Sequence, residues 1–561
     1  RLDARRGLVT RQLASDNDEV NEAWNCDRGR YGFAYAQSPQ RVLIPHLAED
    51  GKLRTASWSE ALRRATDAIR AGRGRGAGVL VGGHLSDQDA YAMQKLARVA
   101  LRSNNVDARG WRGGAAEAAV TGALAGTAGP TYADLDAAAA VVVVDLDPHE
   151  ESPILFLRLR AAALRRGVAV VAVGARAGRL AEFATVVPAA PGGQADALDR
   201  LGRGEGDAGR LLGEARGRRQ GGVVVLAGWR AASGGGLAAA ARLAGTLGGR
   251  LAWVPRRAGD RGALDAGARP DLLPGGRPVG DEGARRELGE AWGAELPAEP
   301  GLDAPAMLRA AADGELGVLV LAGVDLVRDH GPRELAERAL ANAFVIAIDH
   351  ELNETTRHAE VLLPGAVHAE TDGSYTDWEG RVQWTRHAVP VGGAAQTVWE
   401  LADQLSLRLK VDLGLGNLDA VAAETARWRA RPEGAAAAPA PDPEPVEPSG
   451  PEDGLALVSY PLLLDGASLL ARSVDLNRET EPAFCELHPG DAARLGLAMG
   501  QRATLDFGDG VTAELPVRVS DGIAPGCVFV PSNQPDLSLG ALLGPTPARR
   551  VALRAAGEVA A

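Results

Sequence analysis

Short apolar runs that alternate with helical segments dominate residues 77–348 and constrain the fold more than any other feature. The runs are rich in Val and Leu and are bounded by Gly or Asp. Such runs are typical of buried parallel strands, which are connected by helices. The predicted strands are residues 79–81, 141–144, 168–173, 223–226, 318–321 and 344–348, with helices at 58–69, 88–101 and 154–166. This alternation predicts an α/β fold.

The composition changes after residue 431. Seven prolines, interleaved with Ala, Glu and Asp, lie between Pro432 and Pro451 and predict a semi-rigid linker. Asp509 and Gly510, between two later apolar runs, indicate a tight hairpin. The β-type runs after the linker are residues 455–464, 484–487, 502–507, 511–519 and 527–530. They predict a separate, small all-β barrel domain.

Composition and charge exclude several classes of protein. The net charge is −12 and Arg is spread along the whole chain, so the Arg enrichment does not indicate nucleic-acid binding. Three cysteines, at positions 26, 485 and 527, cannot form a disulfide framework and favour a reducing compartment. No apolar run reaches the ~18–20 residues of a membrane span, so no direct membrane insertion is expected. Because the chain begins with Arg1 rather than Met, we expect a segment upstream of it.

Common catalytic motifs are absent. The glycines at 72–76 precede a strand, and those at 234–236 are followed by no P-loop Lys. The segment 255–300 is rich in Gly and Pro, which predicts a long ordered loop or an insertion. A group of acidic and histidine side chains could form a metal site: His350, His358, His368, Glu370, Asp372, Asp377 and Glu379. Their spacing fits no zinc or two-His-carboxylate template, which favours structural hydrogen bonding around a buried turn.

Cys26 lies in the sequence NEAWNCDRGR, residues 21–30. A lone buried thiol is usually unreactive. A single thiolate cannot hold an iron–sulfur cluster, which needs about four such ligands. From the residues alone Cys26 therefore has no chemistry, and Cys485 and Cys527 are expected to pack in the barrel.

A long block between residues 344 and 383 resembles the signature of the molybdopterin oxidoreductase superfamily. It reads FVIAID, ETT, AEVLLP, ETDGSY and WEGRVQ at residues 344–349, 354–356, 359–364, 370–375 and 378–383. Residues 21–30 resemble the segment that closes the family's N-terminal iron–sulfur module. Residues 455–545, with HPGDAARLG at 488–496, resemble its molybdopterin-dinucleotide-binding barrel. The resemblance implies an α/β multidomain fold, as in formate dehydrogenase and DMSO reductase domains 1–3, with a C-terminal six-stranded β-barrel of the double-psi type.

The same resemblance implies how the chain divides into domains. The end of the 4Fe–4S Mo/W bis-MGD-type module is expected at 1–56 and an inserted Rossmann-like α/β domain at 131–315. A discontinuous α/β domain would comprise 57–130 and 316–428. The Pro-rich linker would cover 429–453, and the molybdopterin-dinucleotide-binding-like barrel 454–561.

One branch of the superfamily fits best. Residues 261–267, Pro270 and residues 273–278 are similar to a stretch of the large iron–sulfur subunits of bacterial NADH–quinone oxidoreductase, which is respiratory complex I. In that branch the fold survives as a non-catalytic domain of the peripheral arm, so the chain would be part of a translocase without an active site of its own.

Departures from the molybdenum enzymes support that branch. Residues 108–114 offer no thiol or hydroxyl to a metal, and Asp147 precedes Pro148 where the family has Asn. Gly174 or Ala175 stands where the family's guanine-reading Asp would fall. An Asp at 147 would also repel the phosphates of a pterin nucleotide. The sequence therefore predicts no molybdenum cofactor.

The resemblance gives Cys26 a role. It implies that Cys26 is the fourth ligand of a [4Fe–4S] cluster in the intact chain, with the other three ligands upstream of Arg1. The expected partners are other peripheral-arm subunits, notably the FMN/NADH-binding subunit, on the cytoplasmic side of the cell membrane. The alternatives are a catalytic Mo/W bis-molybdopterin oxidoreductase such as formate dehydrogenase, and a cofactor-free accessory module of another redox complex.

Overall fold

The computed structural model describes residues 1–72, 74–109, 114–218, 221–232, 234–330, 332–431, 449–467, 469–543 and 548–557. Most of the predicted Pro-rich linker, residues 432–448, lies outside these ranges. So do residues 110–113, which are part of the stretch 108–114 that offers no thiol or hydroxyl to a metal.

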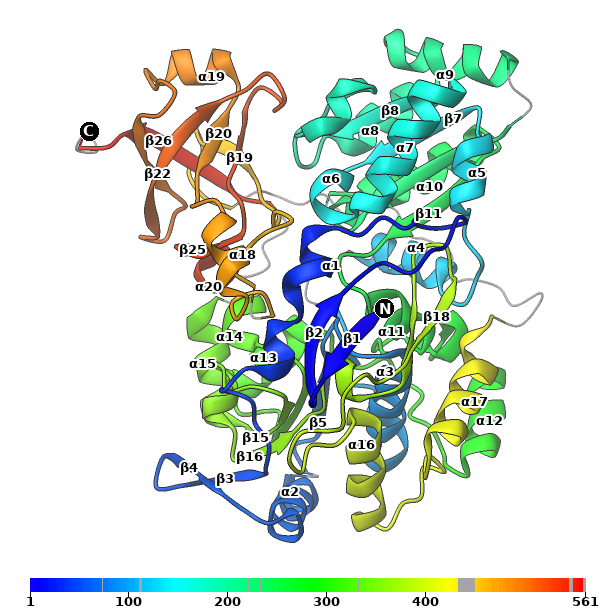
Figure 1. The fold of residues 1–561 in the computed structure, drawn as a ribbon, viewed down its shortest axis with the longest axis vertical. Coiled ribbons are helices and arrows are strands. Elements are labelled where there is room, and N and C mark those ends of the chain that lie inside the picture. The colour runs from blue at the N-terminus through cyan, green and yellow to red at the C-terminus, as the bar shows by residue number, and fades with distance from the viewer. Residues whose placement is uncertain are drawn as a thin grey trace.

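A seven-stranded sheet forms the lower half of the molecule in Figure 1. Its order is β4-β3-β16-β15-β14-β5-β6, and all neighbours from β16 to β6 are parallel. The strands are β3 (His46–Glu49), β4 (Lys52–Thr55), β5 (Ala77–Val81), β6 (Val106–Asp107), β14 (Val318–Ala322), β15 (Phe344–Asp349) and β16 (Val361–Pro364). In chain order the parallel strands are arranged 2-1-3-4-5, which is the flavodoxin-like order.

Helices cover both faces of this sheet because its strands are apolar on both sides. Val79 and Val320 pack in one core, while Leu80 and Leu319 pack in the core on the opposite face. The first core is formed with α2 (Trp58–Gly72), α3 (Asp87–Lys95), α12 (Glu282–Trp292), α16 (Val398–Arg408) and α17 (Leu418–Arg429). The second is formed with α13 (Ala304–Ala312) and α15 (Arg333–Asn342).

A five-stranded, wholly parallel sheet lies at the upper right of Figure 1. Its order is β11-β10-β7-β8-β9, which read from the β9 edge is 3-2-1-4-5 in chain order, the arrangement of one Rossmann half with its continuation. The strands are β7 (Ala140–Val144), β8 (Ala169–Gly174), β9 (Thr185–Pro188), β10 (Val223–Gly228) and β11 (Arg250–Val254). The helices on its faces are α4 (Ala115–Leu124), α8 (Gln194–Gly202), α9 (Gly206–Arg218) and α10 (Gly236–Thr246) on one side, and α5 (Tyr132–Ala137) and α7 (Pro153–Arg166) on the other.

A closed barrel of six strands lies at the upper left of Figure 1, in the order β19-β23-β20-β22-β21-β26. Its strands are β19 (Leu455–Val458), β20 (Cys485–Leu487), β21 (Arg502–Asp506), β22 (Thr512–Val519), β23 (Cys527–Phe529) and β26 (Arg550–Ala555). The predicted hairpin is confirmed, because β21 and β22 are antiparallel and both Asp509 and Gly510 have positive φ. The six-stranded barrel is confirmed, whereas the double-psi crossing and the domain boundaries stay predictions.

The segment 255–300 differs from the loop that its Gly and Pro content predicts. It contains α11 (Asp260–Asp265), the short strands β12 (Leu272–Leu273) and β13 (Arg277–Pro278), and α12. Leu288 and Trp292 of α12 are buried in the core of the seven-stranded sheet. Gly262 is required for close contact rather than for a loop, since a Cβ there would lie 1.8 Å from the carboxylate of Asp87.

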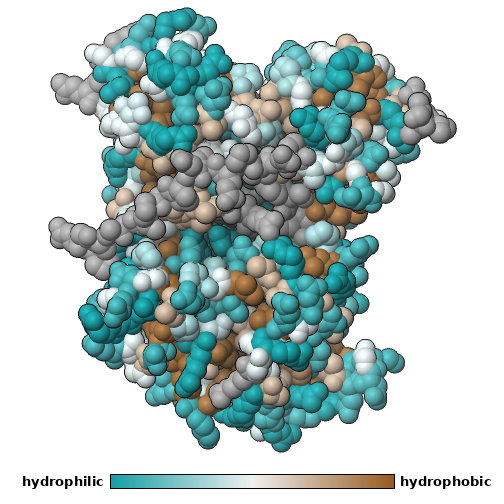
Figure 2. All heavy atoms as spheres, turned by 180° about the vertical axis from the view of Figure 1, so that it is seen from behind, coloured by the Kyte–Doolittle hydropathy of each residue, from teal (hydrophilic) through white to brown (hydrophobic). Residues whose placement is uncertain are grey.

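Among the described residues, no helix is long and apolar enough to span a bilayer. Seen from behind, hydrophilic and hydrophobic residues are interspersed over the face in Figure 2.

Asp87, at the start of α3, joins that helix to the hairpin of β17 (Gly373–Thr376) and β18 (Val382–Thr385). Its carboxylate accepts hydrogen bonds from the hydroxyls of Ser374 and Thr376, at 2.9 and 2.8 Å. Burial raises the pKa of Asp87 to about 6, despite these hydrogen bonds and the nearby Arg429. Ionisation of this carboxyl group therefore costs folding free energy, although its hydrogen bonds hold it in place.

Replacement of this carboxyl group changes how stability depends on pH. Because its pKa is raised in the folded state, wild-type stability falls as pH rises from about 4 to about 6. We expect Asp87→Asn to remove this fall, which amounts to about 3 kcal/mol of unfolding free energy. The stability of the variant relative to the wild type should therefore increase as pH rises across this window. Denaturant unfolding at a series of pH values measures it, with the exposed Asp475→Asn as control. Parallel stability profiles for Asp87→Asn and the wild type would contradict the prediction.

Candidate functional site

The seven-stranded sheet has its strand-order reversal between β5 and β14, and a cavity lies there. In open parallel sheets ligands bind outside the carboxyl ends of the strands at such a reversal. Gly82 and Gly83 follow β5, and Gly323 follows β14. A Cβ on Gly82 would lie only 2.0 Å from the carbonyl oxygen of Gly323, so glycine is required where the two chain segments meet.

The cavity has a volume of about 530 Å³, within the usual range for a small-molecule site. It is lined from every part of the fold: by the N-terminal segment, by the carboxyl ends of both sheets, and by the segment that follows β19. The lining includes Cys26 and Tyr35, His84, Gly323 and Asp349–Glu351, Glu150–Glu151 and Arg256–Ala258, and Pro461–Leu463.

Four aromatic rings that carry titratable groups form a chain along the cavity. Tyr35 lies between His350 and His368, with ring centroids 5.5 and 5.6 Å apart, and its hydroxyl is hydrogen-bonded to Nδ1 of His368. His84 meets His350 edge-on at 5.9 Å. Burial lowers the pKa of His368 to about 4 and raises that of Tyr35, so both are uncharged at neutral pH.

Asp349, at the carboxyl end of β15, fixes the orientation of the His350 ring. One of its oxygens lies 3.1 Å from Nδ1 of His350 and accepts the backbone N–H of the same residue at 2.7 Å. The imidazole contacts are the main reason that the pKa of Asp349 is lowered in spite of burial. The arrangement can orient an imidazole and exchange protons at the cavity wall.

Cys26 is half-buried and caps the amino end of the short helix α1 (Asp27–Tyr31). Its Sγ accepts a hydrogen bond from the backbone N–H of Gly29 at 3.3 Å, and the residue lines the cavity. Cys485 and Cys527 are fully buried in and beside the barrel core, where burial raises both thiol pKa values to about 12. The described residues contain no group of three or more His, Cys, Asp or Glu side chains that could hold a metal ion.

The remaining residues of the predicted acidic and histidine cluster are spread over separate structural contacts. Glu370 is buried and accepts two hydrogen bonds from Arg41, at 3.1 and 2.9 Å. Glu379 accepts the backbone N–H of Tyr132 at 2.7 Å. Asp372 lies at the surface, where hydrogen bonds from His387 and Arg386 lower its pKa to about 2. Only His350 and His368 of that cluster reach the cavity.

The five-stranded sheet has its own strand-order reversal between β7 and β10, and side chains fill it. Asp147 follows β7 and Arg230 follows β10. Glu151, at the end of α6 (Pro148–Glu151), accepts hydrogen bonds from Arg230 at 2.6 Å, from the indole N–H of Trp229 at 2.7 Å and from the backbone N–H of Asp147 at 2.9 Å. This crevice is therefore occupied by the chain itself.

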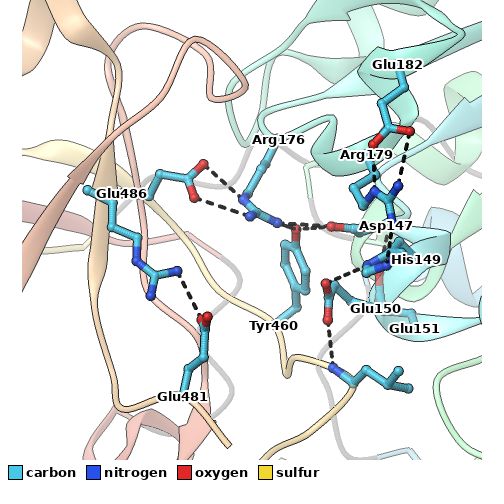
Figure 3. A network of polar contacts seen from close by, with 12 residues as sticks. Asp147, His149, Glu150, Glu151, Arg176, Arg179, Glu182, Tyr460, Glu481 and Glu486 are labelled. Atoms are coloured by element: carbon cyan, nitrogen blue, oxygen red, sulfur yellow. Dashed lines mark hydrogen bonds and ion pairs between the residues drawn. The ribbon is translucent and has the colours of Figure 1, made fainter. Parts of the chain in front are cut away.

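A second set of contacts connects this crevice to the barrel (Figure 3). Arg176, two residues after β8, forms a two-pronged ion pair with Glu486 of β20, with N–O distances of 3.1 and 3.2 Å. The same guanidinium donates to Asp147 at 3.0 Å and to the hydroxyl of Tyr460 at 2.6 Å. Tyr460 also donates to Asp147 at 2.8 Å.

This arrangement does not fit a pterin dinucleotide at the five-stranded sheet. The space at the reversal holds the Tyr460 ring, and Asp147 and Glu151 there are paired with Arg176 and Arg230. A phosphate that took either guanidinium would leave a buried carboxylate without its partner, which is unfavourable. Asp145, which follows β7 with positive φ, is half-buried as a residue, and desolvation of its carboxyl group raises its pKa to about 6.

Sequence reasoning missed the residues that build this network. Arg176 and Arg230 are two of many arginines spread along the chain, and Tyr460 lies inside an apolar run that predicts only a strand. The available signal was Asp147, which the sequence marks as unsuited to a phosphate. Its partners could be found only from the packing of the barrel on the sheet.

Comparisons with known proteins agree with this architecture. The chain matches the molybdopterin oxidoreductase family at residues 41–198 and 216–408, and the Molydopterin dinucleotide binding domain family at residues 468–552. The G subunit of NADH-quinone oxidoreductase from Mycobacterium bovis is 39% identical over 549 residues, and that from Streptomyces coelicolor is 38% identical over 566 residues. Each alignment covers 95% of this chain and 66% of the relative, so the chain spans less than two thirds of their length.

A solved structure shows the same fold. Acetylene hydratase from Pelobacter acetylenicus superposes with a TM-score of 0.63 at 15% identity, covering 97% of this chain and 96% of that one. The α/β molybdopterin-oxidoreductase-like fold inferred from the sequence is thereby confirmed.

The depressed pKa of His368 can be tested. The unfolded chain binds a proton at this ring near pH 6.5, while the folded chain does not until about pH 4, so acid destabilises the fold through this group. As pH falls between these values, we expect the unfolding free energy of His368→Gln to decrease by about 3 kcal/mol less than that of the wild type. Denaturant unfolding measures this, with the exposed His358→Gln as control. An imidazole NMR titration of His368 centred near its ordinary value would refute it.

Proposed function

Because this chain belongs to the molybdopterin oxidoreductase family and is homologous to the G subunit of NADH-quinone oxidoreductase, we propose that it is the scaffold portion of such a subunit. In the intact enzyme electrons pass from NADH through FMN and iron–sulfur clusters to quinone. This portion holds no molybdenum site and performs no catalysis by itself. It positions the iron–sulfur part of the subunit and offers surfaces to neighbouring subunits.

The observation that carries the scaffold proposal is the filled crevice of the five-stranded sheet. Arg176, Tyr460 and Glu151 occupy the position at which this strand order binds a ligand, and Asp147 presents a buried carboxylate there. A dinucleotide would have to displace a set of ion pairs and leave charges buried without partners, which is strongly unfavourable. The fold is retained while the cofactor position is used for internal packing.

Cys26 is proposed as the fourth ligand of a [4Fe–4S] cluster whose other ligands lie upstream of Arg1. Three features of its surroundings support this. The thiol is only half-buried, it faces the cavity side of the N-terminal segment, and its Sγ already accepts a backbone N–H. Hydrogen bonds from backbone N–H groups to cluster sulfurs are one way in which proteins tune such sites.

The proposed partners follow from the same homology. They are other peripheral-arm subunits of complex I, notably the FMN/NADH-binding subunit, and the assembly lies on the cytoplasmic side of the cell membrane. No nucleic acid is involved.

A catalytic Mo/W bis-molybdopterin oxidoreductase, such as a formate dehydrogenase, is the second candidate. One observation favours it: the strand-order reversal of the seven-stranded sheet keeps a cavity of about 530 Å³, with the imidazoles of His84 and His350 in its wall. The filled crevice of the five-stranded sheet opposes it.

The cluster proposal predicts the effect of removing one thiol. In the intact full-length chain, Cys26→Ala should lower the bound iron by about four atoms and abolish the EPR signal of one cluster. Cys485→Ala and Cys527→Ala, which remove buried barrel thiols, are matched controls and should leave iron and EPR unchanged. Unchanged iron content and EPR spectrum in Cys26→Ala would refute the ligand role.

The two candidate functions differ in metal content. Elemental analysis of the purified full-length protein should find neither molybdenum nor tungsten at a stoichiometric level. One atom of either metal per chain would reject the scaffold proposal in favour of the catalytic alternative.

A further inference from the structure

Tyr460 occupies the place where the five-stranded sheet would bind a ligand. The chain comes out of β19 of the barrel, and two residues later Tyr460 enters the crevice between the carboxyl ends of β7 and β10. Its side chain is completely buried. The residue comes from outside the sheet, as a ligand would.

The ring of Tyr460 is held on its faces by groups suited to an aromatic ligand. The Arg230 guanidinium lies over the ring at 3.9 Å from its centroid, a close cation–π contact. Phe529 of β23 packs against it with ring centroids 4.7 Å apart. Arg230 belongs to the sheet and Phe529 to the barrel, so the ring is enclosed by both.

The hydroxyl of Tyr460 is recognised as specifically as the ring. It donates to Asp147 at 2.8 Å and accepts from Arg176 at 2.6 Å, so a donor and an acceptor converge on one oxygen (Figure 3). The guanidinium of Arg176 is charged, and bonds to charged groups are the stronger kind. The other oxygen of Asp147 has no hydrogen-bond partner, which makes Asp147 dependent on Tyr460 and Arg176.

The surrounding backbone brings the barrel to the same place. Ala524 donates to the carbonyl of Ala175 at 2.7 Å, and Ala177 donates to that of Gly522 at 3.2 Å, on either side of Arg176. Ala175, Tyr460 and Phe529 also share one small apolar core with barrel residues. The barrel is therefore docked around the inserted ring.

We propose that the crevice of the five-stranded sheet is a binding site for a phenol, and that Tyr460 is its built-in ligand. Insertion of Tyr460 docks the barrel on the sheet and closes the crevice to external molecules. The site recognises an aromatic ring through Arg230 and a hydroxyl through Asp147 and Arg176. This inference concerns the fold of the chain and does not rest on the proposed function, since its tests measure stability and not metal content or electron transfer.

The test removes the built-in ligand and supplies it from solution. Tyr460→Ala should lower the melting temperature of the chain, and phenol should restore part of the loss. For this variant, the dissociation constant of toluene, which has the ring without the hydroxyl, should be at least ten times that of phenol. Thermal shift against ligand concentration gives both apparent dissociation constants.

A matched control separates recognition from the filling of a cavity. Phe507 is equally buried in the barrel, in an apolar core without these charged partners. Phe507→Ala should be stabilised by toluene at least as well as by phenol. Equal stabilisation of Tyr460→Ala by toluene and phenol, or a phenol shift of the same size in the wild type, would overturn the proposal.

Tyr460→Phe keeps the test decisive if the alanine variant fails to fold. The phenylalanine ring retains the packing but leaves Asp147 and Arg176 without the hydroxyl, so the melting temperature should fall. The exposed Tyr31→Phe should leave it unchanged. An unchanged melting temperature in Tyr460→Phe would show that the hydroxyl contacts do not hold the barrel, which contradicts the proposal.

Discussion

Burial of parallel strands on both faces is the constraint on which the rest of this structure depends. Such strands admit only apolar side chains along their length, so polar groups gather where the strands end. Both sheets direct their carboxyl ends toward one central space. His84 and His350 emerge there from the seven-stranded sheet, while Glu150 and Glu151 emerge from the five-stranded sheet. The cavity at the junction is a consequence of this geometry.

The two strand-order reversals differ, because one borders a cavity and the other is filled by side chains. That of the seven-stranded sheet keeps a cavity whose lining includes His84, His350 and Tyr35. Tyr35 contacts His350 and His368, and His350 pairs with Asp349. That of the five-stranded sheet is filled by Arg176, Arg230 and Tyr460. Buried charges are stable only where each has a partner, so the filled reversal is a unit that cannot be removed one residue at a time.

The N-terminal segment is tied to the same centre. Arg28, two residues after Cys26, donates to the carbonyls of Leu463 and Leu462 and to the carboxylate of Asp465, at 2.8, 3.2 and 3.0 Å. These three residues follow Tyr460 in the chain. The proposed cluster ligand is therefore connected to the barrel segment that docks on the five-stranded sheet, which is the kind of rigid link that a scaffold for iron–sulfur groups requires.

The sequence alone located the central buried strands, such as residues 141–144, 223–226 and 318–321, because Val-rich runs bounded by Gly or Asp specify them locally. It did not locate the helices within 255–300. It also indicated the family, through the block around Glu379 and the segment around Cys26. It could not give the partners of Asp147, which lie 29 and 313 residues away at Arg176 and Tyr460. Nor could it separate His350 and His368, which reach the cavity, from Glu370, which pairs with Arg41. Only tertiary structure decided these, because long-range pairing depends on how the barrel and the two sheets pack, and no local pattern records it.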